Sequence, residues 1–180
     1  MEVNKDMPHE KTEKNYHFQE AKEEHLPRLL EIYNYYVMHS TATFHTKPFT
    51  REEMRGLLFY VKPLYRTFVL YSGDEICGYV TLGRHNNRDA YDTTGEVGIY
   101  LKPDCTGKGI GSIALKHIEG YAVQKGFHAL IATITGENEQ SIRLFRKNGY
   151  EKCAHYREVG KKFGRWLDVV AYEKLLIGEP

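Results

Sequence analysis

The sequence predicts one α/β domain built around a mixed β-sheet. β-rich runs alternate with stretches whose apolar residues recur at helical spacing. Residues 96–134 also read as strand, helix and strand, which is the order of a parallel crossover unit. With 180 residues, of which 41% are apolar, the chain can bury one core of this kind. The expected order of elements is β-α-α-β-β-β-α-β-α-β-β, within residues 16–180.

The first part of the chain supplies a strand and two helices. Residues 16–21 are strand-like, and residues 23–40 place apolar side chains on one helical face. These side chains are Leu26, Leu29, Leu30, Tyr33 and Val37. Residues 51–62 repeat the spacing, and Pro63 lies just past their end. The apolar face of this second helix is expected to carry Met54, Leu57, Leu58 and Val61.

The rest of the chain supplies the main sheet. Residues 67–72 and 75–85 are β-rich and flank the turn at Gly73, which predicts an antiparallel hairpin. Gly126 suits the end of a helix, because glycine readily adopts the left-handed conformation found there. The further elements expected are strands at 96–102, 128–134, 150–160 and 165–176, and helices at 112–125 and 139–148.

Composition and charge limit the function. The chain has 25 Lys and Arg against 24 Asp and Glu, and its formal charge of +1 gives no reason to expect nucleic-acid or membrane-surface binding. No apolar run approaches the length of about 18 residues that a membrane span needs. Residues 1–15 are charged, so we expect a flexible extension and not a signal peptide or an anchor.

Cysteine and histidine spacing gives no sign of a disulfide framework or a metal site. Cys77, Cys105 and Cys153 form no C-x-x-C pair, which argues against structural zinc and favours a reducing cytoplasm. The histidines show no spacing typical of metal ligands. We therefore expect no metal.

Residues 105–112 read CTGKGIGS and lie between an expected strand and an expected helix. The N-terminus of a helix offers free N–H groups, and glycines let the backbone approach a phosphate closely. The loop therefore indicates a diphosphate cradle, although a purely structural turn stays open. Its G-x-G-x-G spacing differs from the dinucleotide-binding fingerprint, and Lys108 lies inside the glycines, which excludes the P-loop.

The stretch TGKGIGS, followed by a helix and then NEQSIRLFRKNGY, is similar to the coenzyme A signature of the GNAT N-acetyltransferase superfamily. Three more stretches look like its phosphinothricin and methionine sulfoximine acetyltransferase branch: YNYYVMHSTATFHTKPFT, RDAYDTTGEVGIYL and FGRWLDV. The resemblance runs from about Tyr16 to the C-terminus. It implies a GNAT fold whose seven-stranded sheet splays between its fourth and fifth strands, acetyl-CoA as cosubstrate, and a homodimer.

By this resemblance, the glycine loop holds the coenzyme A pyrophosphate and the preceding strand binds the pantetheine arm through its main chain. The residues so implied are Ile99, Leu101, Thr106, Gly107, Lys108, Gly109, Ile110, Gly111, Ser112, Asn138, Ser141 and Phe145. Two of them depart from the family pattern. Thr106 stands where the family usually has Arg or Gln. Phe145, which cannot donate a proton, stands where most relatives have Tyr and this branch has His facing the departing sulfur.

Acetyl transfer to an amine requires a base, because an ammonium group has no free electron pair. Amines titrate at ~8 to ~10.4, so near neutral pH the proton must be removed at the site. Glu96 heads the strand before the glycine loop, and weakly polar surroundings are expected to raise its pKa; an exposed strand-end acid is the structural alternative. The amides near Tyr100 and Leu101 are expected to bind the oxyanion, and Tyr100 is a candidate proton donor.

The acceptor side is implied by the resemblance at Phe44, Arg88 and Tyr91. The guanidinium of Arg88 can pair with a carboxylate or a phosphinate through two hydrogen bonds, although a solvated loop arginine is the alternative. Trp166 is expected in packing or at an interface.

The resulting prediction is an N-acetyltransferase that moves acetyl from acetyl-CoA directly to a small amino-acid-like amine of the phosphinothricin or methionine sulfoximine kind. Direct transfer is favoured because no cysteine stands where a nucleophile could be activated. Two alternatives stay open. One is the same chemistry on a peptide N-terminus or a polyamine, and the other is a silenced coenzyme-A-binding sensor, suggested by Phe145 and Thr106.

Overall fold

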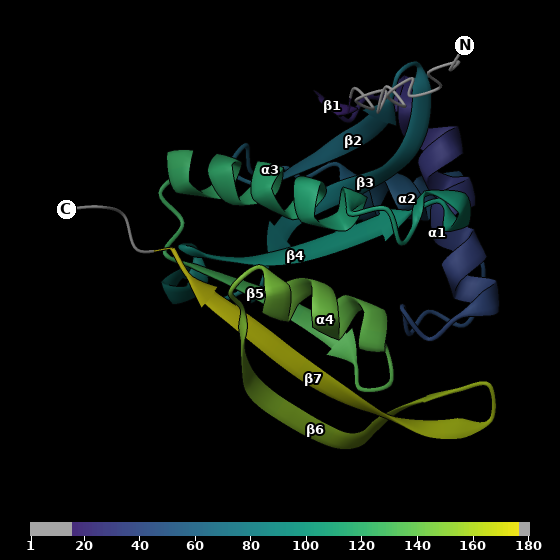
Figure 1. Cartoon of the computed structure of the whole chain (residues 1–180), viewed down its shortest axis with the longest axis vertical. Coiled ribbons are helices and arrows are strands. Elements are labelled where there is room, and N and C mark those ends of the chain that lie inside the picture. The colour runs from purple at the N-terminus through teal and green to yellow at the C-terminus, as the bar shows by residue number, and fades with distance from the viewer. Residues whose placement is uncertain (1–15, 177–180) are drawn as a thin grey trace, which may run out of the picture.

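The computed structural model describes residues 16–176 and contains one seven-stranded mixed sheet (Figure 1). Its strands are β1 (Tyr16–Glu20), β2 (Arg66–Ser72), β3 (Glu75–Arg84), β4 (Thr94–Leu101), β5 (Ala129–Thr135), β6 (Glu151–Lys162) and β7 (Arg165–Leu175). They lie in the order β1-β2-β3-β4-β5-β7-β6, and every neighbouring pair is antiparallel except β4 and β5. The predicted fold class is confirmed. The predicted extension at residues 1–15 lies outside the described residues.

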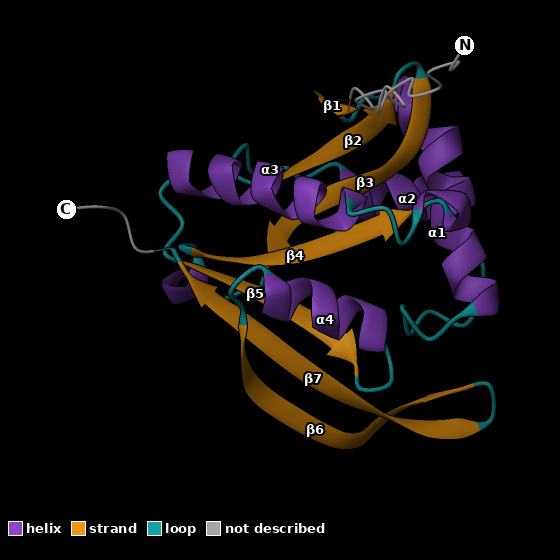
Figure 2. Ribbon diagram, viewed as in Figure 1, coloured by secondary structure: helices purple, strands orange, loops and turns teal. Residues whose placement is uncertain are grey.

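Four helices cover the two faces of the sheet (Figure 2). They are α1 (Leu26–His39), α2 (Arg51–Leu58), α3 (Ile110–Gln124) and α4 (Glu139–Lys147). Helices α1 and α2 pack on one face, where Leu29 and Met54 meet Tyr79 of β3. Helices α3 and α4 pack on the other face, where Ile118 meets Val80, the next residue of β3. Because side chains alternate along a strand, consecutive residues feed two separate cores.

Helix α2 is shorter than the sequence predicts. It ends at Leu58, because Phe59 already has an extended backbone (φ −107°, ψ 104°), and a turn leads from there to β2. Val61, which was expected on the apolar face of the helix, is fully exposed. A residue before proline is biased away from helical conformation, so Pro63 already disfavours continuation to residue 62. Within the described residues, no helix is both long and apolar enough to cross a membrane.

The sheet splays open between β4 and β5, as predicted. These strands pair only where Thr94–Glu96 lies beside Ala129–Ile131, although β4 continues to Leu101 and β5 to Thr135. The divergence is visible in Figure 1. Beyond the splay, β5 stays paired with β7 along its whole length. The free edge of β4 therefore faces a gap, and Glu96 is the last residue of β4 before that gap opens.

The hairpin of β6 and β7 reaches across to the loop between α1 and α2. The ammonium of Lys162 is buried and donates to the carbonyl of Thr43 at 2.8 Å. A Cβ added to Gly160 would lie 2.1 Å from the ring of Phe44, so only glycine lets the ring pack so closely on β6. These contacts join the C-terminal hairpin to the end of α1.

Candidate functional site

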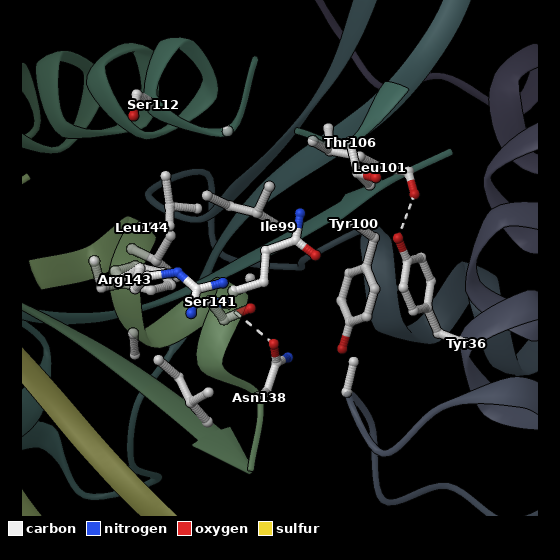
Figure 3. Close-up of a pocket in the computed structure, with 18 of the residues that line it drawn as sticks. Tyr36, Ile99, Tyr100, Leu101, Thr106, Ser112, Asn138, Ser141, Arg143 and Leu144 are labelled. Carbon is white, nitrogen blue, oxygen red and sulfur yellow. Dashed lines mark hydrogen bonds between the residues drawn. The ribbon is translucent and has the colours of Figure 1, made fainter. Parts of the chain in front are cut away.

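A cavity of about 520 Å³ fills the gap between β4 and β5 (Figure 3). Its walls come from β4, the glycine loop, the start of α3, β5, α4 and the C-terminal end of α1. The predicted residues that line it are Ile99, Tyr100, Leu101, Thr106, Gly107, Gly109, Gly111, Ser112, Asn138, Ser141 and Phe145. Segments far apart in the sequence thus meet around one hollow.

Several predicted site residues do not line this cavity. The Ile110 side chain is buried in the core at the start of α3. The ammonium of Lys108 folds back onto the carbonyl of Asp104. Glu96, Phe44, Arg88 and Tyr91 are also absent from the lining: Glu96 belongs to β4, Phe44 to the loop after α1, and Arg88 and Tyr91 to the segment between β3 and β4.

The glycine loop presents backbone to the cavity. Gly107 and Gly109 have left-handed φ angles of 74° and 79°, and a Cβ added to either would meet open space. The amide of Ser112 donates to the Gly109 carbonyl at 3.1 Å. The amides of Ile110 and Gly111 have no backbone acceptor among the described residues. Free amides at a helix N-terminus beside open space are an anion-binding arrangement.

Gly111 has a different role from the first two glycines of the loop. A Cβ added there would lie 2.9 Å from Leu144 Cδ2, so Gly111 lets α3 and α4 approach each other. The same two helices are joined by Asn148, whose side-chain amide donates to Ser112 Oγ at 3.1 Å. The loop is therefore a cradle in its first half and a packing contact in its second.

The free edge of β4 offers main-chain groups to the cavity. The Lys102 amide donates to Cys77 of β3 at 2.7 Å, and backbone groups alternate in direction along a strand. The amides and carbonyls of Ile99 and Leu101 consequently face the gap, whereas the amide of Tyr100 faces β3. Of the two amides expected to bind an oxyanion, it is that of Leu101 which faces the cavity.

Tyr36 and Tyr100, which both line the cavity, lie side by side (Figure 3). The hydroxyl of Tyr36, on α1, donates to the Leu101 carbonyl at 2.6 Å, and burial raises the pKa of Tyr36 to about 12. The ring of Tyr100 packs between Tyr33, Tyr36 and Tyr79, with centroids 5.1–5.6 Å apart. Burial raises the pKa of Tyr100 well above its ordinary value, so both hydroxyls stay protonated. Tyr36 lies in a stretch that carries the family resemblance, but the sequence assigned it no role; the fold brings it to Leu101, which lies 65 residues further along the chain.

Helix α4 forms the opposite wall. Asn138 caps this helix by accepting from the Ser141 amide at 3.1 Å, and Phe145 packs edge-on against Tyr150 with centroids 5.0 Å apart. Arg143 and Lys147 also line the cavity. Sequence reasoning missed these two cations, although their spacing of four residues places them on one helix face.

Glu96 and Tyr100 lie on the same face of β4, because side chains alternate between the two faces of a strand and these residues are four positions apart. Its side chain is 37% exposed, and its Oε2 lies 3.3 Å from Nδ1 of His85. His85 contacts the ring of Tyr91 edge-on, with centroids 5.9 Å apart. No motif in the sequence singles out His85, which follows β3 directly.

Arg88 and Tyr91 belong to the loop between β3 and β4, which ion pairs hold in place. Arg84 and Lys62 both contact Asp92, at 3.2 and 3.0 Å. The hydrogen bond from Lys62 lowers the pKa of Asp92, which favours the charged state of this anchor. The side chain of Arg88 forms no ion pair among the described residues. Its guanidinium is therefore available to an anion.

Metal ligation finds no support in the described part of the chain. Residues 16–176 contain no group of three or more His, Cys, Asp or Glu side chains placed to hold a metal ion.

Comparison with known proteins connects this geometry to a family. A model described as "Acetyltransferase (GNAT) family" matches residues 29–150. The chain is 39% identical over 158 residues to a phosphinothricin N-acetyltransferase of Streptomyces coelicolor, covering 86% of this chain and 92% of that one. It is 32% identical over 147 residues to an L-methionine sulfoximine/L-methionine sulfone acetyltransferase of Salmonella typhimurium, covering 78% and 83%.

Solved structures agree with the fold. A phosphinothricin acetyltransferase from Sinorhizobium meliloti in complex with acetyl-CoA has a TM-score of 0.85 and 31% identity, covering 89% of this chain and 88% of that one. A putative acetyltransferase from Salmonella typhimurium with its cofactor acetyl-CoA has a TM-score of 0.81 and 29% identity, covering 91% and 95%.

Proposed function

The chain belongs to the acetyltransferase (GNAT) family, and we propose that it transfers acetyl from acetyl-CoA to the primary amine of a small amino-acid-like acceptor. Phosphinothricin and methionine sulfoximine are the first acceptors to consider, because relatives with these names are 32–39% identical to the chain. The observation that carries the proposal is the splayed cavity, where the glycine cradle and the free edge of β4 meet beside Glu96.

Acetyl-CoA fits this cavity chemically. The amides of Ile110 and Gly111 would bind its pyrophosphate, in the open space beside Gly107 and Gly109. The main chain of Ile99 and Leu101 would hold the pantetheine arm, as an added strand pairs with a free sheet edge. Asn138 and Ser141 would line the other side, from α4. Acetyl-CoA is therefore the proposed cosubstrate.

The proposed reaction is direct transfer with Glu96 as the base. Glu96 takes a proton from the acceptor ammonium, and the free amine attacks the thioester carbonyl to form the C–N bond. The Leu101 amide stabilises the resulting oxyanion. The C–S bond then breaks, the coenzyme A thiolate leaves, and the nitrogen loses its second proton as the thiolate gains one. The net products are the N-acetyl compound, coenzyme A and one proton.

The acceptor would approach from the loop side. Arg88 is exposed and has two N–H groups suited to a carboxylate or a phosphinate, while Tyr91 and Phe44 offer rings to its carbon chain. We expect Arg88→Ala to raise the acceptor KM by about tenfold or more. Arg88→Lys, which keeps the charge without the planar fork, should recover only part of that loss.

We also propose a cytoplasmic homodimer. β6 is a twelve-residue strand at the edge of the sheet, and the hairpin it forms with β7 exposes Tyr156, Val159, Phe163 and Trp166. Exposed aromatic and apolar side chains along a long edge strand are typical of a covered interface. Light scattering should give twice the chain mass, and Trp166→Glu should reduce the mass to that of one chain.

A silenced coenzyme-A-binding sensor is the second candidate. It is favoured by Phe145, which lines the cavity at the position where the family resemblance implies a proton donor, and by Thr106, whose hydroxyl donates to the Pro103 carbonyl at 2.8 Å. A sensor would bind acetyl-CoA without consuming it.

One assay separates the candidates. Thiol release from acetyl-CoA is measured against phosphinothricin, methionine sulfoximine, common amino acids, spermidine and a short peptide. We expect turnover to be fastest with the first two, and the acetylated product is identified by mass. Faster turnover with the peptide or with spermidine would assign the acceptor to peptide N-termini or to polyamines. Tight acetyl-CoA binding without turnover on any amine would favour the sensor.

A further inference from the structure

The carboxylate of Glu96 has one hydrogen-bonding partner among the described residues, and that partner is His85. Nδ1 of His85 lies 3.3 Å from Oε2 of Glu96, while the other carboxylate oxygen accepts no hydrogen bond from the described part of the chain. Both side chains are partly shielded, with 30% and 37% exposure. The carboxylate is thus held at one oxygen and free at the other.

Among the side chains near Glu96, His85 is the one that donates a hydrogen bond to its carboxylate. Nη2 of Arg84 contacts Asp89 and Asp92, and no nitrogen of this guanidinium makes a hydrogen bond or ion pair with Glu96 among the described residues. The Tyr60 hydroxyl packs near Gly83 and makes no hydrogen bond to Glu96 within the described residues. A carboxylate in its charged form can only accept hydrogen bonds, so this contact requires the proton to be on Nδ1 of the imidazole.

His85 also touches the loop that carries the proposed acceptor contacts. Its ring meets that of Tyr91 edge-on at 5.9 Å, and Tyr91 lies three residues after Arg88. One side chain therefore contacts both Glu96 and the neighbouring loop. A group that joins a base to a substrate-binding loop can fix the distance between them.

We propose that His85 is a positioning residue for Glu96: its Nδ1–H holds Oε2 so that the free oxygen faces the acceptor amine, and its ring sets the loop of Tyr91 against the base. This inference rests on the proposed function, in which Glu96 removes the amine proton. His85 itself gains and loses no proton in the step. It acts by restricting the rotamers of the carboxylate, which a half-exposed glutamate would otherwise sample freely.

Two substitutions separate positioning from general packing. His85→Ala removes the donor and the ring, whereas His85→Asn keeps a side-chain N–H near the position of Nδ1. We expect His85→Ala to lower kcat/KM for the acceptor about tenfold, with the acetyl-CoA Kd unchanged within about twofold. His85→Asn should stay within about threefold of the parent. Equal losses in both variants, or a loss confined to acetyl-CoA binding, would overturn the proposal.

A double-mutant cycle tests whether His85 acts through Glu96. In a Glu96→Gln background, His85→Ala should lower activity by less than about twofold, because the base it serves is gone. A full tenfold loss in that background would assign His85 to something other than Glu96. If Glu96→Gln alone leaves kcat/KM unchanged, the proposed base is wrong. That outcome differs from one in which Glu96→Gln lowers kcat/KM and His85→Ala lowers it by the same factor in both backgrounds.

A measurement without substrate keeps the inference testable even if no acceptor is turned over. Nitrogen NMR of the labelled imidazole should show the proton on Nδ1 in the parent and on Nε2 in Glu96→Ala, where the carboxylate is absent. The same tautomer in both proteins would sink the proposed hydrogen bond. His117, which contacts Phe18 and Phe68 far along the sheet, is the internal control and should keep its signals unchanged.

Discussion

The two sides of β4 are built in opposite ways. On the proposed cofactor side, β4 and the glycine loop offer mainly backbone amides and carbonyls within residues 99–111, and side chains of α4 form the opposite wall. On the proposed acceptor side, they are side chains from separate segments: Phe44 after α1, Arg88 before β4 and Glu96 within it. The first side depends on conformation and tolerates changes of side chain. The second depends on a few individual side chains and on the contacts that orient them.

Acetyl-CoA binding should be lost when a negative charge fills the open space beside the glycine loop. Gly109→Asp places a carboxylate where the cradle is empty, beside the free amides of α3, and we expect the acetyl-CoA Kd to rise by more than about 100-fold, or ~2.7 kcal/mol. Calorimetry measures this directly. Gly109→Asn is the matched control, because asparagine has the same shape and tolerates the left-handed conformation.

If charge is the cause, the asparagine variant should bind clearly better than the aspartate variant. Equal weakening in both would assign the loss to backbone strain. Binding by the aspartate variant within about threefold of the parent would show that the pyrophosphate lies elsewhere.

Acetyl transfer should be lost when the proposed base on the acceptor side is removed, while acetyl-CoA binding is kept. Glu96→Gln is expected to lower kcat/KM by about 10²–10⁴ and to leave the acetyl-CoA Kd within about twofold. Part of the loss should return at high pH, where the amine is already free. Glu31→Gln, an exposed change on α1, is the control and should have full activity. Unchanged rates for Glu96→Gln at neutral pH would remove Glu96 from the mechanism.

The same contrast explains what the sequence could predict. The glycine loop and its helix were predictable because spacing within one short stretch carries the information, and the order of elements followed from local periodicity. Tyr36 and His85 were not, since their roles arise from contacts with Leu101 and Glu96 that only the folded sheet creates. Val61 was misplaced for the related reason that helical spacing continued past the point where the backbone turns.

Glu137 joins segments that the sequence also could not connect, and it gives a smaller, pH-dependent effect. Its carboxylate accepts two hydrogen bonds from Arg165 of β7, at 2.5 and 2.6 Å, and one from Thr41 after α1 at 2.7 Å. Pairing with Arg165, and then with Thr41, lowers the pKa of Glu137 to about 2. A lowered carboxyl pKa contributes stability above the unfolded value of ~4.3, and this is lost as pH falls toward 2.

We therefore expect Glu137→Gln to lower the melting temperature by about 2–4 °C at pH 7, which corresponds to ~1 kcal/mol for a half-exposed pair. The difference from the parent should shrink between pH 4.5 and 2. Melting curves of both proteins across this range measure it. A difference that stays constant down to pH 2 would mean that the glutamine disturbs packing and that the charge of Glu137 contributes nothing.

Phe145 should give the smallest effect, although it is one of the two residues, with Thr106, that depart from the pattern implied by the family resemblance. Its ring lines the cofactor wall of the cavity but cannot protonate the departing thiolate. A thiol with an ordinary pKa near ~8.5 leaves readily as its anion, so amine deprotonation and attack should set the barrier. Phe145→Tyr and Phe145→His are then expected to change kcat by less than about tenfold, or ~1.4 kcal/mol.

The two Phe145 substitutions also test which side of β4 limits the rate. Phe145 is buried against Tyr150, so Phe145→Leu serves as a control for packing and should reproduce any loss that comes from a disturbed α4. If Phe145→Tyr raises kcat by much more than tenfold while Phe145→Leu does not, thiolate departure is limiting and the wall formed by α4 decides the rate. If the parent binds acetyl-CoA but acetylates no amine until the tyrosine is installed, the chain is the silenced sensor. Rates that barely move leave the barrier with Glu96 and the amine, on the side of β4 where individual side chains perform the chemistry.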